Sequence, residues 1–165
     1  MKTFTLEIIT PEKVAYKNEV EQISIPAFEG EMGVLPGHID YLAVLNSGEI
    51  RIKPAKDDEP KLFAVSGGFA EIHPKNVVIL CETAEAAEEI NIERAELSKQ
   101  RALLEMASRK AGFLTGCAKE KLIQAKSGIK DKIDTANMEA AIQRSVARLK
   151  VVSDLKKQKK KKINR

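Results

Sequence analysis

The sequence has no tryptophan, only seven aromatic residues, and two cysteines among its 165 residues. So few aromatic rings leave little surface on which nucleic-acid bases could stack. The cysteines, Cys81 and Cys117, are too few for a disulfide framework or a metal cluster. No apolar run approaches the roughly 18 residues of a membrane-spanning helix. Because Glu7 comes too early for the apolar stretch of a signal peptide, we expect a cytoplasmic location.

Residue patterns typical of catalysis are also missing from the sequence. The only histidines, His38 and His73, stand beside glycine or proline in turn-like contexts, and no set of nucleophile, base and orienting group can be assembled around them. The sequence contains no cluster of metal ligands and no glycine-rich phosphate loop before a helix. We therefore predict a protein that is not an enzyme, with no catalytic residues and no metal site.

Proline does not occur after residue 84, and this division indicates two modules. Residues 1–84 hold all six prolines, with 8 basic and 13 acidic residues, whereas the remainder has 20 basic and 11 acidic residues. We predict one domain over residues 1–84, a helical domain over residues 85–155 and a disordered basic tail over residues 156–165. An alternative for the lysine-rich tail is contact with anionic lipid headgroups or with an acidic protein face.

The first module has the pattern of short β-strands. Phe4, Leu6 and Ile8 alternate with polar residues, which is the period of a strand with one solvated face. Further short apolar runs follow, with a turn signal at residues 46–48 and a bulge or tight turn at residues 66–68. Many short strands without a helical period predict a compact β-sandwich.

The second module has the pattern of two amphipathic helices. The first is expected to start near residue 85, with an apolar seam at Ile90, Leu97, Leu104 and Ala111. The second is expected to start at Asp134 as an N-cap, with a seam at Met138, Ile142, Val146, Leu149 and Val152. Together they predict an antiparallel hairpin, and the overall fold class is α+β. Because many seam residues are alanines, we expect the hairpin to dock only marginally on the sandwich.

Residues 29–38 read EGEMGVLPGH, which resembles the E-G-x-x-G-V-L-P-G-H signature of the epsilon subunit of F-type ATP synthases. Residues 8–11 (IITP), 66–72 (SGGFAEI) and 140–149 (AAIQRSVARL) resemble further segments of that family, in the same order along the chain. The segment 105–132 departs from the family by being longer than the usual link between the helices.

The resemblance implies a β-sandwich followed by a helical hairpin, as the residues themselves predict. It implies a non-catalytic subunit of the central stalk, peripheral on the cytoplasmic face of the bacterial membrane, that binds the gamma subunit and the ring of c subunits. Such a subunit rotates with them and couples proton flow to ATP synthesis. The hairpin is implied to extend along gamma toward the alpha and beta catalytic subunits and to inhibit ATP hydrolysis.

The resemblance also assigns partner contacts to residues of the signature loop. Glu29 and Glu31 are implied to contact polar loops of the c ring, the alternative being an ordinary solvated acidic loop. His38 is expected to hold the shape of this loop through hydrogen bonds rather than to touch a partner.

A second implied site is an ATP site in the folded hairpin, which some bacterial members form with an I/L-D-x-x-R-A motif and arginines of the second helix. Residues 90–95 read INIERA and match that motif except at Asn91, where the family has Asp. The alternative is that the arginines form a solvated face or meet acidic groups of the catalytic subunits. The expected ATP-binding residues are Glu85, Asn91, Arg94, Arg144 and Arg148, and binding is expected to be weak, with no other cofactor.

The basic second helix also suits inhibition. Arg144, Arg148 and Lys150 offer positive charge to an acidic surface of the catalytic subunits, and such charges steer docking. A remote alternative is a nucleic-acid-binding module built on the basic half, which would predict affinity that falls steeply with salt. The acidic first half and the scarcity of aromatic residues argue against it.

Overall fold

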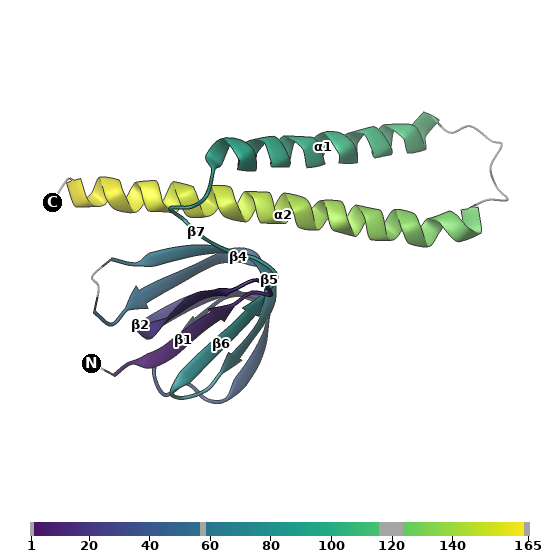
Figure 1. Cartoon of the computed structure of the whole chain (residues 1–165). Helices are drawn as coiled ribbons and strands as arrows, with labels where there is room; N and C mark the ends of the chain where they lie inside the picture. The colour runs from purple at the N-terminus through teal and green to yellow at the C-terminus, as the bar shows by residue number, and fades with distance from the viewer. Residues whose placement is uncertain (1, 57–58, 116–123, 164–165) are drawn as a thin grey trace.

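The computed structural model describes residues 2–56, 59–115 and 124–163. These residues form a β-sandwich carrying two long antiparallel helices (Figure 1). The strands are β1 (Phe4–Ile9), β2 (Val14–Ala27), β3 (Gly30–Val34), β4 (Tyr41–Pro54), β5 (Lys61–Ile72), β6 (Asn76–Cys81) and β7 (Ala84–Ala86), and the helices are α1 (Ile92–Thr115) and α2 (Gln124–Ile163). The α+β fold class predicted from the sequence is confirmed. No described helix is long and apolar enough to cross a membrane.

The sandwich is a closed ring of strands. Its order is β1-β6-β5-β4-β2, and β1 pairs again with β2 to close the ring, while β3 adds to β2 and β7 adds to β5. The β1–β6 pair is parallel and the other pairs are antiparallel. Inside lies one core of mainly aliphatic side chains, of which Leu6, Ile8, Ile23, Ile25, Ile50, Ile52, Ile72 and Ile79 are fully buried. Closure leaves few strand edges exposed.

Two long strands bend where the sequence predicted interruptions. The turn predicted at residues 46–48 is wrong, because β4 continues through these residues and pairs with β5 on both sides of them. The bulge or tight turn expected at residues 66–68 is also wrong, because β5 continues through them and keeps one register with β4 on both sides. Gly67 and Gly68 nevertheless have φ of +91° and +135° within β5. A Cβ atom on Gly68 would lie 2.0 Å from the carbonyl oxygen of Leu80. The bends let one strand serve both layers of the sandwich, so local turn residues are used here without ending the strand.

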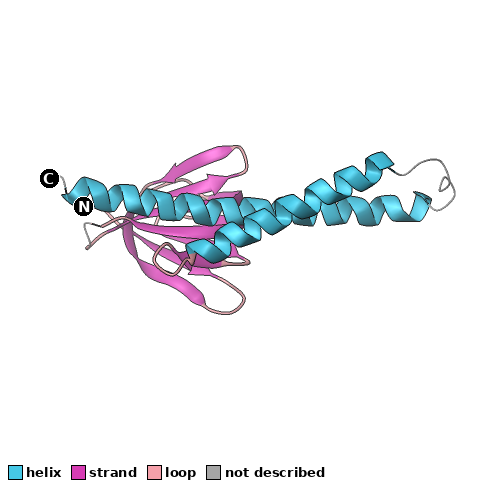
Figure 2. Cartoon of the chain, turned by 90° about the horizontal axis from the view of Figure 1, so that it is seen from above, coloured by secondary structure: helices cyan, strands magenta, loops and turns pink. Residues whose placement is uncertain are grey.

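The hairpin rests on the sandwich through α2. α2 lies between α1 and the strands β4 and β5, and both helices reach past the edge of the sandwich (Figures 1 and 2). The apolar docking cluster is small and consists of Leu62, Ala64, Ala87, Ile90, Val151 and Val152. Most of these side chains are short, so the area that docking removes from water is modest.

Of the described residues in the predicted first seam, only Ile90 packs with α2, where it joins Val151 and Val152 in the docking cluster. Leu97 and Leu104 are 54% and 70% exposed, whereas Ala95 and Ala102 are buried. Alanine lets the helices approach closely, which leaves the leucines on the outer side. On α2, Val146 is 42% exposed while its neighbour Ala147 is buried, and Val152 is the one described seam residue that is buried. The side chains of Ala111 and Met138 lie outside the described residues.

The ends of α2 also differ from the sequence prediction. α2 begins at Gln124 rather than at Asp134, and it continues to Ile163 through most of the tail predicted to be disordered. No proline interrupts these segments, and lysine is a good helix former, so a helix anchored by tertiary packing can propagate through both. The strand β7 crosses the compositional boundary at residue 84.

Candidate functional site

The junction between the hairpin and the sandwich is held by an arginine–carboxylate pair. Arg148 of α2 donates from Nε and Nη2 to the two carboxylate oxygens of Glu85 in β7, at 2.9 and 2.5 Å. The two side chains are 26% and 35% exposed. One turn earlier in α2, Nη1 of Arg144 lies 3.8 Å from a carboxylate oxygen of Glu82. Two basic side chains of α2 therefore face two acidic side chains of the sandwich.

The start of α1 completes a pocket beside this pair. Asn91 caps the helix, because its Oδ1 accepts a hydrogen bond from the backbone N–H of Arg94 at 3.0 Å. Asp in this position would cap the helix equally well, so Asn91 preserves the local structure without the charge. The pocket has a volume of about 330 Å³ and is lined by Glu85, Glu89, Ile90, Asn91, Arg94, Ala95, Ser98 and Arg148. Four of the five expected ATP-binding residues thus meet, and Arg144 does not line the pocket.

The three residues of the signature loop are not brought together. Glu29 and Glu31 are exposed near the start of β3, and His38 follows the other end of this strand of 5 residues. Glu31 accepts a hydrogen bond from Ser24 Oγ at 2.5 Å and pairs with Arg51 at 3.1 Å. The Nδ1 atom of His38 lies 2.8 Å from the carbonyl oxygen of Ile39, so the ring contacts its own loop.

His73 forms a cluster that the sequence analysis did not identify. Its Nδ1 lies 2.8 Å from Asp40 and its Nε2 lies 2.8 Å from Glu71. A neutral imidazole can donate from one nitrogen only, so two carboxylate partners favour the imidazolium form. The hydrogen bonds to Asp40 and then to Glu71 accordingly raise the pKa of His73. Protonated His73 ties the loop after β3 to the end of β5.

An exposed row of apolar side chains was also missed. Val44, Phe69, Leu80, Ile9 and Val14 are direct cross-strand neighbours on β4, β5, β6, β1 and β2. Val44, Phe69, Leu80 and Val14 are 50%, 52%, 49% and 54% exposed. We call these five residues the apolar row. The sequence of β6, NVVILC, carries a signal for it, since this strand is apolar on both faces.

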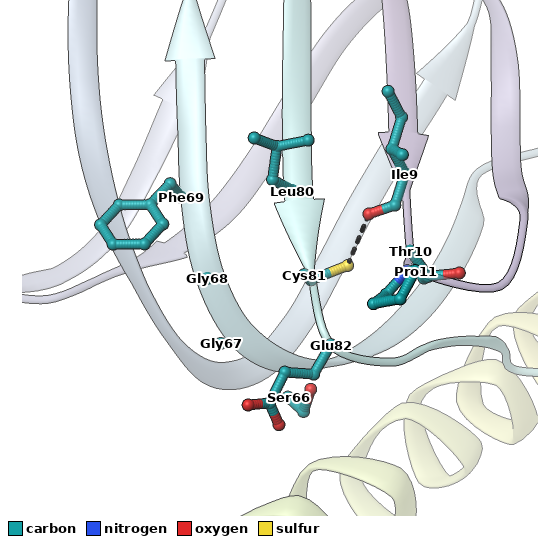
Figure 3. A pocket seen from close by; sticks show the side chains of 10 residues that line it. All are labelled: Ile9, Thr10, Pro11, Ser66, Gly67, Gly68, Phe69, Leu80, Cys81 and Glu82. Atoms are coloured by element: carbon teal, nitrogen blue, oxygen red, sulfur yellow. Dashed lines mark hydrogen bonds between the residues drawn. The ribbon is translucent and has the colours of Figure 1, made fainter.

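A pocket of about 490 Å³ lies beside the apolar row (Figure 3). Ile9, Phe69 and Leu80 form its apolar wall, and the bare backbone of Gly67 and Gly68 borders it. Cys81 lies in the same pocket, with its Sγ directed at the carbonyl oxygen of Ile9 at 3.8 Å (Figure 3). Burial raises the pKa of the Cys81 thiol to about 11. This surface suits an apolar partner rather than thiol chemistry.

Comparisons with known proteins agree over nearly the whole chain. The family model described as "ATP synthase, Delta/Epsilon chain, beta-sandwich domain" matches residues 3–87. A protein named ATP synthase epsilon chain from Nitratidesulfovibrio vulgaris (strain DP4) is 40% identical over 150 residues, which cover 91% of this chain and 96% of that protein. One of the same name from Bacillus mycoides (strain KBAB4) is 39% identical over 156 residues, covering 94% and 100%.

Among solved structures, a chain of the cryo-EM structure of Euglena gracilis mitochondrial ATP synthase (OSCP/F1/c-ring) superposes with a TM-score of 0.61. The superposition covers 86% of this chain and 76% of that chain at 24% sequence identity. At that identity the likeness supports the fold alone.

Proposed function

The chain belongs to the family of ATP synthase epsilon chains, non-catalytic subunits of that complex, and we propose that its sandwich joins the gamma subunit to the c ring while its hairpin restrains ATP hydrolysis. In this role the sandwich rotates with the central stalk and couples proton flow to ATP synthesis. It does so as a peripheral protein at the cytoplasmic face of the bacterial membrane. The observation that carries the proposal is the apolar row.

The apolar row supports gamma as the partner of the sandwich. It runs across five strands of the closed sheet; four of its members are about half exposed, and Ile9 is partly exposed. A contiguous apolar surface of this kind is typical of a permanent protein interface, where packing removes it from water. We assign Glu29 and Glu31, which are exposed, to the polar contact with the c ring, and His38 to holding its own loop.

The gamma contact is tested by a charge in the middle of the row. Phe69→Glu places a carboxylate where an apolar partner would cover it, and we expect at least a tenfold loss of affinity for isolated gamma, measured by surface plasmon resonance. Leu35→Glu is the matched control, because Leu35 is 57% exposed on a loop away from the row. Equal affinities of the two variants would contradict the assignment.

The hairpin has side chains that can form a second set of contacts when it leaves the sandwich. Leu97 and Leu104, seven residues apart on one face of α1, are exposed in the docked state together with Leu103. We propose that this leucine stripe packs on gamma in the extended hairpin. Arg144, Arg148 and Lys150 would then meet acidic groups of the alpha and beta subunits. Because Arg148 is bound to Glu85 when docked, it cannot serve both states at once.

Docking can be followed through a thiol placed under α2. Ala147 is 5% exposed on the face of α2 toward the sandwich, so in an Ala147→Cys, Cys117→Ser chain the labelling rate reports the undocked fraction. Cys81 stays silent because it is buried with a pKa of about 11. We call this measurement the labelling assay.

The leucine stripe is tested by replacing Leu97 and Leu104 with Gln. Both are exposed, so the labelling rate should not change, whereas ATP hydrolysis by the reconstituted complex should rise because the extended state loses its packing. Leu35→Gln serves as the control for an exposed leucine outside the hairpin. Unchanged hydrolysis in the double variant would remove the stripe from the inhibitory state.

A second candidate function is ATP sensing, which the pocket at the start of α1 favours. Arg94 and Arg148 line it together with the capping Asn91, and arginines can bind phosphate with two hydrogen bonds. ATP would have to displace Glu85 from Arg148, so binding is expected to be weak. Calorimetric titration should show ATP binding that Asn91→Asp alters and Arg148→Ala abolishes, while Arg101→Ala, outside the pocket lining, leaves it unchanged. Absence of ATP binding would leave the hairpin as a regulator without a ligand.

A further inference from the structure

A carboxylate lies buried in the surface on which α2 docks. Glu49 of β4 has a side chain that is 2% exposed, and its Oε1 accepts a hydrogen bond from Arg51 Nε at 2.5 Å. Its other oxygen, Oε2, is buried, and no residue in the described part of the chain donates a hydrogen bond to it. No motif in the sequence marks Glu49.

α2 is the element that covers Glu49. Ile50 and Ile52 point into the sandwich core, so the alternation along β4 directs Glu49 and Arg51 to the outer face. The direct cross-strand partner of Glu49 is Ala64, which belongs to the docking cluster with Val151 of α2.

A cavity of about 580 Å³ borders Glu49 between the sandwich and the helix. The α2 side chains that line it include Ile142, Val146 and Lys150. The wall that α2 contributes to the cavity beside Glu49 is therefore a mixture of apolar and basic groups.

The positive charge beside Glu49 is shared with other acids. Arg51 also pairs with Glu31 at 3.1 Å, and its charge acts on Asp154 of α2. Because one guanidinium is shared by several carboxylates, it offsets the desolvation cost of each carboxylate only in part. A buried carboxylate oxygen without a donor carries an uncompensated desolvation cost, and this cost ends when the covering element leaves and water reaches the oxygen.

We propose that Glu49 keeps the docking of α2 on the sandwich reversible, by placing a poorly compensated carboxylate under the helix. The proposal rests on the two-state hairpin of the proposed function. Without Glu49, the affinity of α2 for the sandwich would be set by the apolar contacts of the small docking cluster and by the Arg148–Glu85 pair. Glu49 lowers that affinity, so the hairpin can leave when its partners are available.

The proposal is tested with two replacements of Glu49 in the full chain. Glu49→Gln removes the charge with little change in shape, and Glu49→Met removes the polarity at similar volume. In the labelling assay we expect both to slow labelling of the thiol at position 147 about tenfold, because both remove the buried charge, while the exposed Arg51 keeps its pair with Glu31. Urea unfolding of each variant establishes that the sandwich is intact.

Glu21→Gln is the matched control. Glu21 is 17% exposed and pairs with Lys53 at 2.7 Å within the sandwich, and the pocket that it lines with Gln22 and Leu35 contains no residue of α2. Its replacement should leave labelling unchanged. Unchanged or faster labelling in both Glu49 variants would overturn the proposal, since the Glu49–Arg51 pair would then be neutral or favourable for docking.

Hydrolysis by the reconstituted complex separates this proposal from the function on which it rests. If the Glu49 variants slow labelling and also raise the rate of ATP hydrolysis, the role of Glu49 and the inhibitory role of the hairpin both stand. If they slow labelling without changing hydrolysis, the role of Glu49 stands and the inhibitory role of the hairpin fails.

Discussion

Removal of the Arg148–Glu85 pair should shift the hairpin toward the undocked state. The pair joins α2 to β7 with two hydrogen bonds, and its side chains are 26% and 35% exposed. Solvent at this exposure screens the interaction, so we take about 1 kcal/mol, near the upper end for surface pairs, rather than the larger value of a buried pair. That energy corresponds to about a fivefold change in the ratio of docked to undocked molecules.

The labelling assay measures this shift directly. Arg148→Ala and Glu85→Gln should each speed labelling of the thiol at position 147 about fivefold, and the double variant should add little because both changes remove the same interaction. Lys53→Ala is the control, because Lys53 pairs with Glu21 inside the sandwich. Full additivity of the two single changes, or rates equal to that of the control, would refute the assignment of the pair as a docking contact.

Three further predictions concern the sandwich. The pKa of His73 is raised in the folded protein, so the stability that its two carboxylate contacts contribute is complete below its ordinary pKa of about 6.5 and is lost as pH rises through the raised folded value. His73→Gln should therefore reduce the free energy of unfolding in urea at pH 6 and change it little at high pH, and a pH-independent difference would contradict this. Gly68→Ala should destabilise the sandwich by at least about 2 kcal/mol, because φ is +135° and the new Cβ would meet Leu80; a urea midpoint like that of the parent would be the contrary result. Because the Cys81 thiol is buried, it should react with an aromatic disulfide at pH 8 only on the time scale of unfolding. Rapid reaction of Cys81 in the native protein would show that this thiol is accessible to solvent.

The sequence was sufficient to predict a strand-rich module followed by a helical one, because local periodicity and composition determine which kind of element forms. Alternation in β1 and the proline-free, alanine-rich second half each predict one element type, and the structure has both. The bend of β4 at residues 46–48 was missed for a physical reason. Its polar residues and glycine are also what a turn needs, and only the closed ring of strands makes the chain continue as a strand.

The helix faces were harder to assign than the helices themselves. Leu97 and Leu104 have the spacing of a packing seam, yet they are exposed and the alanines Ala95 and Ala102 are buried. Periodicity identifies an apolar stripe but not the partner that it packs against. A helix proposed to serve two states needs two such faces, and a single sequence does not say which face belongs to the docked one.

Local sequence also explains which parts of the candidate sites could be anticipated. The motif at residues 90–95 opens α1, so Asn91 and Arg94 are close by construction, and the helical register of α2 brings Arg148 to them. Glu49 and the apolar row depend on which strand faces are covered. That is a property of the closed ring and of α2, and the sequence carries only weak traces of it.

The most direct test of the central claim is ATP hydrolysis by the reconstituted catalytic complex, with the full chain and with a version that ends at Glu88. That end point keeps β7, which pairs with β5, and removes both helices. We predict that both versions assemble and couple proton transport, and that the shortened chain permits faster hydrolysis because no hairpin can extend. Equal hydrolysis rates with the two versions over a range of ATP concentrations would contradict the regulatory role of the hairpin.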